Sequence, residues 1–247
     1  MSAILTEEQR ALQETAAAYL AQHSNARESR DGDPALWQGI AELGWTAVIV
    51  PEAFGGLGLG LAEAAVLLEE SGRQLTRSPL FSAVALTHPL LVRCATEAAC
   101  QRLLPAMAEG RGVATVIAGP GLSPFVTPAG LEIHARRDGD GWVLDASAPQ
   151  VLDGDTADTA FVVARLDEGG MGLFEVPAGL AGVTRSPLAA WDLSRPRPAG
   201  SWRGCAWAPR RGSMRPARWP TGWPPHWPPR PCCWPPSRWA GRRAASS

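Results

Sequence analysis

Apolar residues recur at every third or fourth position through the first 110 residues, which is the pattern of helices with one buried face. A capping box at Thr6–Gln9 begins the first helix, which is predicted to run to about His23. Its apolar stripe consists of Leu12, Ala16, Tyr19 and Leu20. Asp33-Pro34 begins a second helix, because an aspartate accepts hydrogen bonds from free helix amides and proline fits the first helical position.

Three further helices are predicted before residue 110. The first follows a glycine-rich loop and begins near Leu61. Ser78-Pro79 starts the next, and a kink is expected near Pro89 because proline has no amide hydrogen to donate. Thr96 caps the last one. Residues 1–110 are therefore predicted to form a helical domain.

The segment between the second and third helices has its own pattern. Gly44 is placed to end a helix, and the apolar stretch Trp45–Val50 is predicted to be extended until Pro51 stops it. Four glycines follow at positions 55, 56, 58 and 60. Glycine adopts positive φ angles and lets other backbone approach closely, so this loop is predicted to be tightly packed.

After residue 110 the hydrophobic period changes to that of short strands. The predicted strands are Val113–Ala118, Leu131–Arg137, Trp142–Asp145, Thr159–Leu166 and Met171–Val176. The sequence Asp138–Gly141 is a hairpin turn signal between two of them. The fold class is therefore predicted as α+β, with a small antiparallel β-barrel or β-sandwich domain at residues 111–196.

Several of these segments resemble the acyl-CoA dehydrogenases. That family carries a G-W/L-x-x-x-x-x-P-E-x-x-G-G-x-G segment, matched from Gly44 to Gly58, and a helix ending E-E-x-G-R, matched by Glu69, Glu70, Gly72 and Arg73. Similar family segments are matched by Leu104, Pro105 and Gly110, by Arg137–Leu144, by Ala157-Asp158, by Phe161–Arg165 and by Trp191–Pro196. The resemblance covers about residues 1–196. A glycine loop between two helices of any helical domain is the structural alternative.

The resemblance implies oxidation of an acyl-CoA thioester at the Cα–Cβ bond. In the family a glutamate removes the α-proton and FAD accepts the β-hydrogen as hydride. The family draws that glutamate from its C-terminal helical domain, so no catalytic residue and no metal site are assigned here. Glu69, Glu70, Glu132 and Glu175 are expected on the surface. The acyl group is left open between fatty, branched and steroid-derived chains.

The resemblance also implies which residues face the flavin. A family loop, T-E-P-x-x-G-S-D, corresponds to Ala118–Phe125 and gives Ala118, Gly119, Pro120 and Ser123 as cofactor-binding candidates. Only Pro120 matches directly, with Ser123 matching after a one-residue slip. A family strand, G-x-K-x-W/F-I-T, corresponds to Ala146–Leu152 and adds Gln150, Val151 and Leu152. Its lysine, aromatic residue and threonine are absent here.

Composition divides the chain near residue 196. Residues 195–247 contain 12 Pro, 11 Arg and 7 Trp but none of the 24 acidic residues and no Val, Ile, Leu, Phe or Lys. Without aliphatic residues no core is expected, so residues 197–247 are predicted to be a disordered tail. We interpret it as a frameshifted replacement of the family's C-terminal domain. The alternative is a basic arm that binds nucleic acid or an anionic membrane.

The remaining expectations concern partners and location. The resemblance implies an acyl-CoA substrate and assembly with identical or related subunits; nucleic acid is not expected as a partner. Some family assemblies include a subunit that has lost active-site residues, which makes a non-catalytic partner subunit an alternative function. A helical interaction module at residues 1–110 is a further one. Neither a signal peptide nor an apolar run long enough to span a membrane is found, so a cytoplasmic location is predicted.

Overall fold

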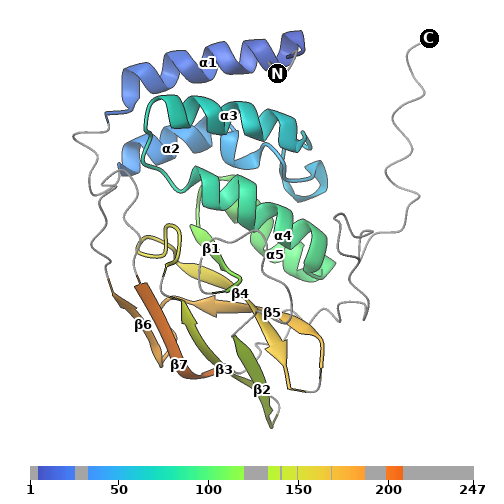
Figure 1. Cartoon of the computed structure of the whole chain (residues 1–247). Coiled ribbons are helices and arrows are strands. Elements are labelled where there is room, and N and C mark those ends of the chain that lie inside the picture. Colours follow the sequence, from blue (N-terminus) through green and yellow to red (C-terminus); the bar gives the residue numbers. More distant parts are fainter. Residues whose placement is uncertain are drawn as a thin grey trace.

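The computed structural model of the chain describes residues 5–25, 33–119, 133–139, 141–148, 150–167, 169–186 and 199–207. Helices gather in one part of the molecule and a curled sheet in the other, with helices α4 and α5 lying between them (Figure 1). The predicted α+β class, with a helical domain followed by a β-domain, is confirmed at this level. Within the described residues, no helix has both the length and the apolar character needed to cross a bilayer.

Helices α1, α2, α3 and α5 begin where the local signals predicted. In chain order they are α1 Glu7–His23, α2 Pro34–Glu42, the 3₁₀ turns η1 Trp45–Ala47 and η2 Glu52–Phe54, α3 Leu61–Arg73, the π-helix η3 Ser82–Thr87, α4 His88–Cys94 and α5 Glu97–Ala108. The capping box at Thr6 forms, with the Gln9 amide donating to the threonine hydroxyl. Asp33 and Thr96 also accept hydrogen bonds from the first-turn amides of their helices.

The extended segment predicted at Trp45–Val50 is wrong. Residues 45–47 form the 3₁₀ turn η1, and the glycine loop folds back onto this region. The amides of Leu57, Gly58 and Leu59 donate to carbonyls of residues 47, 50 and 48. A Cβ atom on Gly56 would lie 1.9 Å from the carbonyl oxygen of Val50, so only glycine fits there. Hydrogen bonds to a later loop therefore replace the strand that the apolar pattern suggested.

The irregularity expected near Pro89 takes the form of the π-helix η3. This stretch ends at Thr87, directly before α4, whose second residue is Pro89. Proline lacks an amide hydrogen and its ring clashes with the carbonyl four residues earlier, so the preceding turn cannot keep the α-helical bonding pattern. A wider turn with bonds to the fifth residue accommodates the proline without ending the helix.

The β-domain is one curled mixed sheet rather than the antiparallel barrel or sandwich that was predicted. Its strands are β1 Ala114–Ile117, β2 His134–Asp138, β3 Gly141–Ala148, β4 Thr159–Leu166, β5 Met171–Pro177, β6 Val183–Ser186 and β7 Ala199–Trp207. The order is β1-β4-β2-β3-β7-β6, with β5 paired to β4. β4 runs parallel to both β1 and β2, whereas the hairpin β2–β3 and the pair β4–β5 are antiparallel.

Strand β7 lies in the stretch for which no strand was predicted. It pairs antiparallel with β3 and β6. The physical reason is that Ala199–Trp207 holds no proline, although the surrounding tail is rich in it, so every backbone amide is available to a sheet. Residues 208–247 lie outside the described part of the chain, so the predicted disorder there is untested.

Two groups of buried apolar residues form the core. One lies within the helical domain and includes Leu20, Ile40 and Leu67. The other joins helices to the sheet, since it contains Leu91 of α4 and Leu104 of α5 together with strand residues. The largest fully buried strand residues in it are Phe161 of β4 and Phe174 of β5. The sheet is therefore packed against α4 and α5, and this second cluster spans both domains.

Candidate flavin-facing site at the domain seam

The second of the two segments predicted to face a flavin is bonded to strand β1, and the first begins just after that strand. The side-chain hydroxyl of Thr115 in β1 donates a 2.6 Å hydrogen bond to the backbone carbonyl of Leu152. Ala118 and Gly119 directly follow the end of this strand, which is Ile117. We call this region, where β1 and residues 150–158 lie next to the π-helix η3, the domain seam.

The candidates differ in how accessible they are. Ala118 and Gln150 are exposed, whereas Gly119 and the side chains of Val151 and Leu152 are buried. Pro120 and Ser123 lie outside the described residues. Leu152 therefore offers a ligand neither its side chain nor a free carbonyl oxygen, because Thr115 binds that oxygen. Where the family carries a threonine, this chain has a residue that is part of the core.

The loop of residues 153–158 is held by hydrogen bonds from three other parts of the chain. Ser82 of η3 donates a 2.5 Å hydrogen bond to the Asp153 carboxylate. Arg185 of β6 donates to the carbonyls of Gly154 and Ala157 at 3.0 and 2.9 Å. The backbone amide of Val113, one residue before β1, donates to the Asp158 carboxylate at 2.9 Å. The loop is thus held by the helical domain, by the far edge of the sheet and by the approach to β1.

A buried histidine at the start of α4 was missed by the sequence reasoning. His88 is only 1% exposed, and its Nδ1 is a buried polar atom for which the described residues supply no partner. The ring hydrogen-bonds the backbone of Thr46. Burial lowers the pKa of His88 from 6.5 to about 4, although this hydrogen bond opposes the shift. The imidazole is therefore neutral at neutral pH. The one sequence feature that draws attention to His88 is its position directly before Pro89, the proline expected to kink the helix.

The carboxylates of Glu70 and Glu175 are held in structural contacts. Glu175 was expected to be a solvated residue. Instead it forms a two-pronged ion pair with Arg102, one arm of which measures 3.1 Å, and its side chain is only 15% exposed. This pair joins α5 to β5. Glu132 lies outside the described residues.

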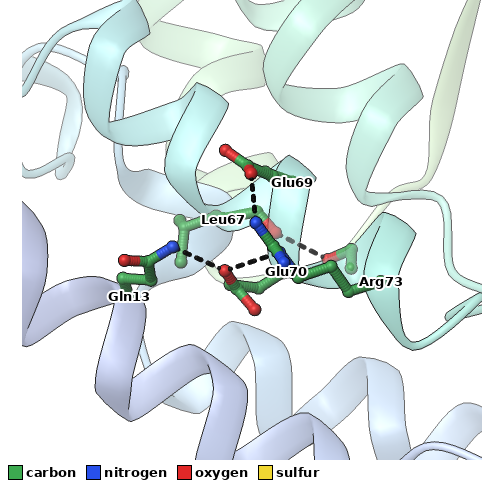
Figure 2. Close-up of polar contacts among 6 residues, drawn as sticks. Gln13, Leu67, Glu69, Glu70 and Arg73 are labelled. Atoms are coloured by element: carbon green, nitrogen blue, oxygen red, sulfur yellow. Dashed lines mark hydrogen bonds and ion pairs between the residues drawn. The ribbon is translucent and has the colours of Figure 1, made fainter. Parts of the chain in front are cut away.

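The expectation that Glu70 lies on the surface is also wrong. Glu70 is 4% exposed, whereas Glu69 next to it has a side chain that is 58% exposed. Figure 2 shows the Glu70 carboxylate between Gln13 of α1, whose amide donates at 2.8 Å, and Arg73, whose Nε lies 3.2 Å away. Residues 64, 67, 70 and 71 are all buried, so helical periodicity already placed position 70 on the inner face. This part of the E-E-x-G-R motif therefore fastens α3 to α1.

The three carboxylates of the seam, those of Asp153, Asp155 and Asp158, contact Ser82, Arg77 and the backbone amide of Val113. The described residues contain no group of three or more His, Cys, Asp or Glu side chains arranged to hold a metal ion. The polar groups at the seam mostly bind the protein's own backbone, as Thr87 does when it donates to the carbonyl of Ala114 at 3.1 Å. Among the predicted cofactor-binding candidates that the structure describes, Ala118 and Gln150 are the exposed ones.

Comparison with known proteins agrees with the fold. Residues 6–111 match the family model of the acyl-CoA dehydrogenase N-terminal domain. Acyl-CoA dehydrogenase IpdE2 of Mycolicibacterium smegmatis is 39% identical over 124 residues, which cover 47% of this chain and 38% of IpdE2. Acyl-CoA dehydrogenase FadE12 of Mycobacterium tuberculosis is 28% identical over 206 residues, which cover 76% of this chain and 51% of FadE12.

A solved structure shares most of this arrangement. The ChsE4–ChsE5 complex from Mycobacterium tuberculosis is 25% identical with a TM-score of 0.73, and the match covers 84% of this chain and 57% of that chain. The chain spans about half the length of the relatives it matches. Residues 6–111 thus match the N-terminal domain of the acyl-CoA dehydrogenases, and the N-terminal and middle regions of this chain are similar to those of proteins named acyl-CoA dehydrogenase.

Proposed function

We propose that residues 1–196 are the part of an FAD-dependent acyl-CoA dehydrogenase that lies against the flavin and the acyl-CoA thioester. The observation that supports this proposal is the hydrogen bond from Thr115 to Leu152, which ties one predicted flavin-facing segment to strand β1, the strand that ends directly before the other. FAD, when bound, supplies the hydride acceptor for α,β-dehydrogenation. The accessible positions for it are Ala118 and Gln150, whereas Val151 and Leu152 act through packing.

This part of the chain does not complete the reaction by itself. A base must reach the α-proton of the thioester, and the carboxylates of Glu70 and Glu175 are already bound to basic or amide side chains. Residues 195–247 contain no aspartate or glutamate and supply no base either. We therefore propose that the chain of 247 residues is inactive alone.

The composition of the tail supports a cause for this inactivity. All basic residues of the chain are arginine, and arginine, proline, tryptophan, alanine, glycine and cysteine are all encoded by codons rich in G and C. A shifted reading frame in a gene of that composition would produce such a tail. We propose sequence limits of 1–110, 111–196 and 197–247, the last being translated in a different frame, although its residues 199–207 pair with the sheet as β7.

The test compares two proteins: the 247-residue chain and a version whose gene has one nucleotide added or removed at codon 196 to restore the frame. Both are purified, supplied with FAD and mixed anaerobically with a series of acyl-CoA thioesters. The frame-restored protein is expected to retain flavin and lose its oxidised-flavin absorbance with at least one thioester. The 247-residue chain is expected to show no flavin reduction. Flavin reduction by the 247-residue chain would refute the proposed inactivity, and failure of every restored version to bind FAD would refute the function.

A second candidate is a non-catalytic partner subunit. It is favoured by Ala118–Phe125, where the family loop is largely absent, and by the structural likeness to a complex of two different subunits. The distinguishing experiment co-expresses the frame-restored protein with related genes from its neighbourhood. Flavin retained only in a mixed complex supports the partner role, whereas flavin retained in a homomer supports the catalytic one.

A further inference from the structure

The hydrogen bond from Ser82 to Asp153 joins residues that are 71 positions apart and belong to different domains. Ser82 is fully buried and is the first residue of the π-helix η3. Asp153 directly follows Leu152, the last of the segment proposed to face the flavin. Because Asp153 and Leu152 share a peptide bond, a displacement of Asp153 also displaces Leu152.

The backbone of Asp153 requires support. Its φ angle is +50°, in the left-handed region, which costs a residue with a side chain about 1 kcal/mol. Aspartate tolerates this region better than most residues because its short carboxylate finds local partners. Here the carboxylate also reaches Ser82, so the bond that stabilises the turn is the one that ties it to the helical domain.

Other contacts of the loop do not replace this tie. Arg185, which binds the carbonyls of Gly154 and Ala157, belongs to the sheet and fixes the loop only relative to its own domain. Arg77 of the helical domain pairs with Asp155, but at 3.7 Å, and the Asp155 side chain is 33% exposed. Long, partly exposed ion pairs contribute little. A short bond from a fully buried hydroxyl to a carboxylate contributes more.

We propose that Ser82 is a positioning residue that sets the place of Gln150–Leu152 relative to the helical domain. Thr115 holds this segment from the sheet side at Leu152, and Ser82 holds it from the helical side at Asp153. The π-helix η3 therefore contributes to this positioning, because its first residue, Ser82, carries the hydroxyl that binds Asp153. The consequence for FAD rests on the proposed function, whereas the positioning itself does not.

The experiment measures amide hydrogen exchange in the full chain for wild type, Ser82→Ala and the control Ser71→Ala. Both serines are buried, but the Ser71 hydroxyl binds the Leu67 carbonyl within its own helix at 2.9 Å. Ser82→Ala is expected to accelerate exchange about tenfold at Gly154, Thr156 and Ala157, whose amides bond back to Val151 and Asp153. Ser71→Ala is expected to leave these amides unchanged.

Two results would overturn the proposal: wild-type exchange at these amides in Ser82→Ala, or an acceleration spread equally through α1 and α3. Should Ser82→Ala not fold, Ser82→Cys replaces it, since a thiol keeps the volume but donates weakly, and the same acceleration is expected. FAD affinity is then compared in the frame-restored protein, where Ser82→Ala is expected to bind about tenfold more weakly than Ser71→Ala. Absence of FAD binding in every version would refute the proposed function and leave the exchange result to decide the role of Ser82.

Discussion

The side-chain hydroxyl of Thr115 lies 2.6 Å from the backbone carbonyl oxygen of Leu152, and both residues are buried. The bond connects strand β1 with a segment 37 residues later, although β3 intervenes in the sequence. It ties the end of one proposed flavin-facing segment, Leu152, to the strand that leads into the other.

Replacing Thr115 with valine should separate shape from hydrogen bonding. Valine has nearly the same volume, but the Leu152 carbonyl would remain buried without its donor. We expect a loss of about 1–2 kcal/mol in the free energy of unfolding, measured by urea denaturation followed by circular dichroism. Thr15→Val, which removes a hydroxyl from an exposed position of α1, is the control and should cost about 0.5 kcal/mol or less. Equal effects of the two substitutions would contradict the assigned role.

Glu70→Ala should be far more costly than Glu69→Ala. Removing the buried carboxylate leaves the Gln13 amide and one side of Arg73 without their acceptor, so we expect about 2–3 kcal/mol of destabilisation in the same assay. Glu69 is exposed and pairs only with Arg73 in the contacts described, so its removal should change stability by about 0.5 kcal/mol at most. Similar losses for both would show that the bond between α1 and α3 contributes nothing.

Gly56→Ala should destabilise the helical domain strongly. The new methyl group would lie 1.9 Å from the Val50 carbonyl oxygen, which belongs to the backbone and cannot rotate away. We expect a loss of about 2 kcal/mol or more, together with loss of protection at the amides of residues 57–59. Gly72→Ala is the matched control: it lies in α3 with open space around its Cβ position, so it should stabilise by about 0.5–1 kcal/mol.

Stability should fall between pH 6.5 and pH 4 because of His88. Burial lowers the pKa of His88 to about 4 in the folded chain, against 6.5 for the unfolded one, so the unfolded state binds the extra proton first. The contribution is fully present above pH 6.5 and is lost as the pH falls towards 4, to a total of about 3 kcal/mol. His88→Leu cannot titrate and should show a flatter dependence over this interval. An unchanged slope in this variant would assign the acid sensitivity to other groups.

Local signals predicted the elements well and long-range relationships poorly. Thr6, Asp33 and Thr96 cap their helices as expected, because a cap depends on residues within one turn. Strand β4 was placed at its observed bounds, Thr159–Leu166, since its run of apolar and β-branched residues is self-contained. The parallel pairing of β4 with β1 was not predicted, because the residues of a strand do not determine which distant strand it pairs with or in which direction.

In the candidate site, too, local features were predicted better than contacts between distant segments. The resemblance selected Ala118 and Gln150, which are exposed, but also Leu152, which packing and the Thr115 hydroxyl remove from the surface. The contact between Ser82 and Asp153 could not be predicted, because it depends on how the two domains are placed. The burial of Glu70 could have been predicted from helical period, since it lies three residues after buried Leu67.

Sequencing the gene across codon 196 decides whether the reading frame changes there. We propose that an acyl-CoA dehydrogenase pattern extends to about residue 196 and that the arginine-, proline- and tryptophan-rich residues beyond it belong to another frame. One of the two alternative frames is predicted to encode apolar residues at helical spacing and at least one glutamate. Two alternative frames that both lack such a pattern would refute the frame change.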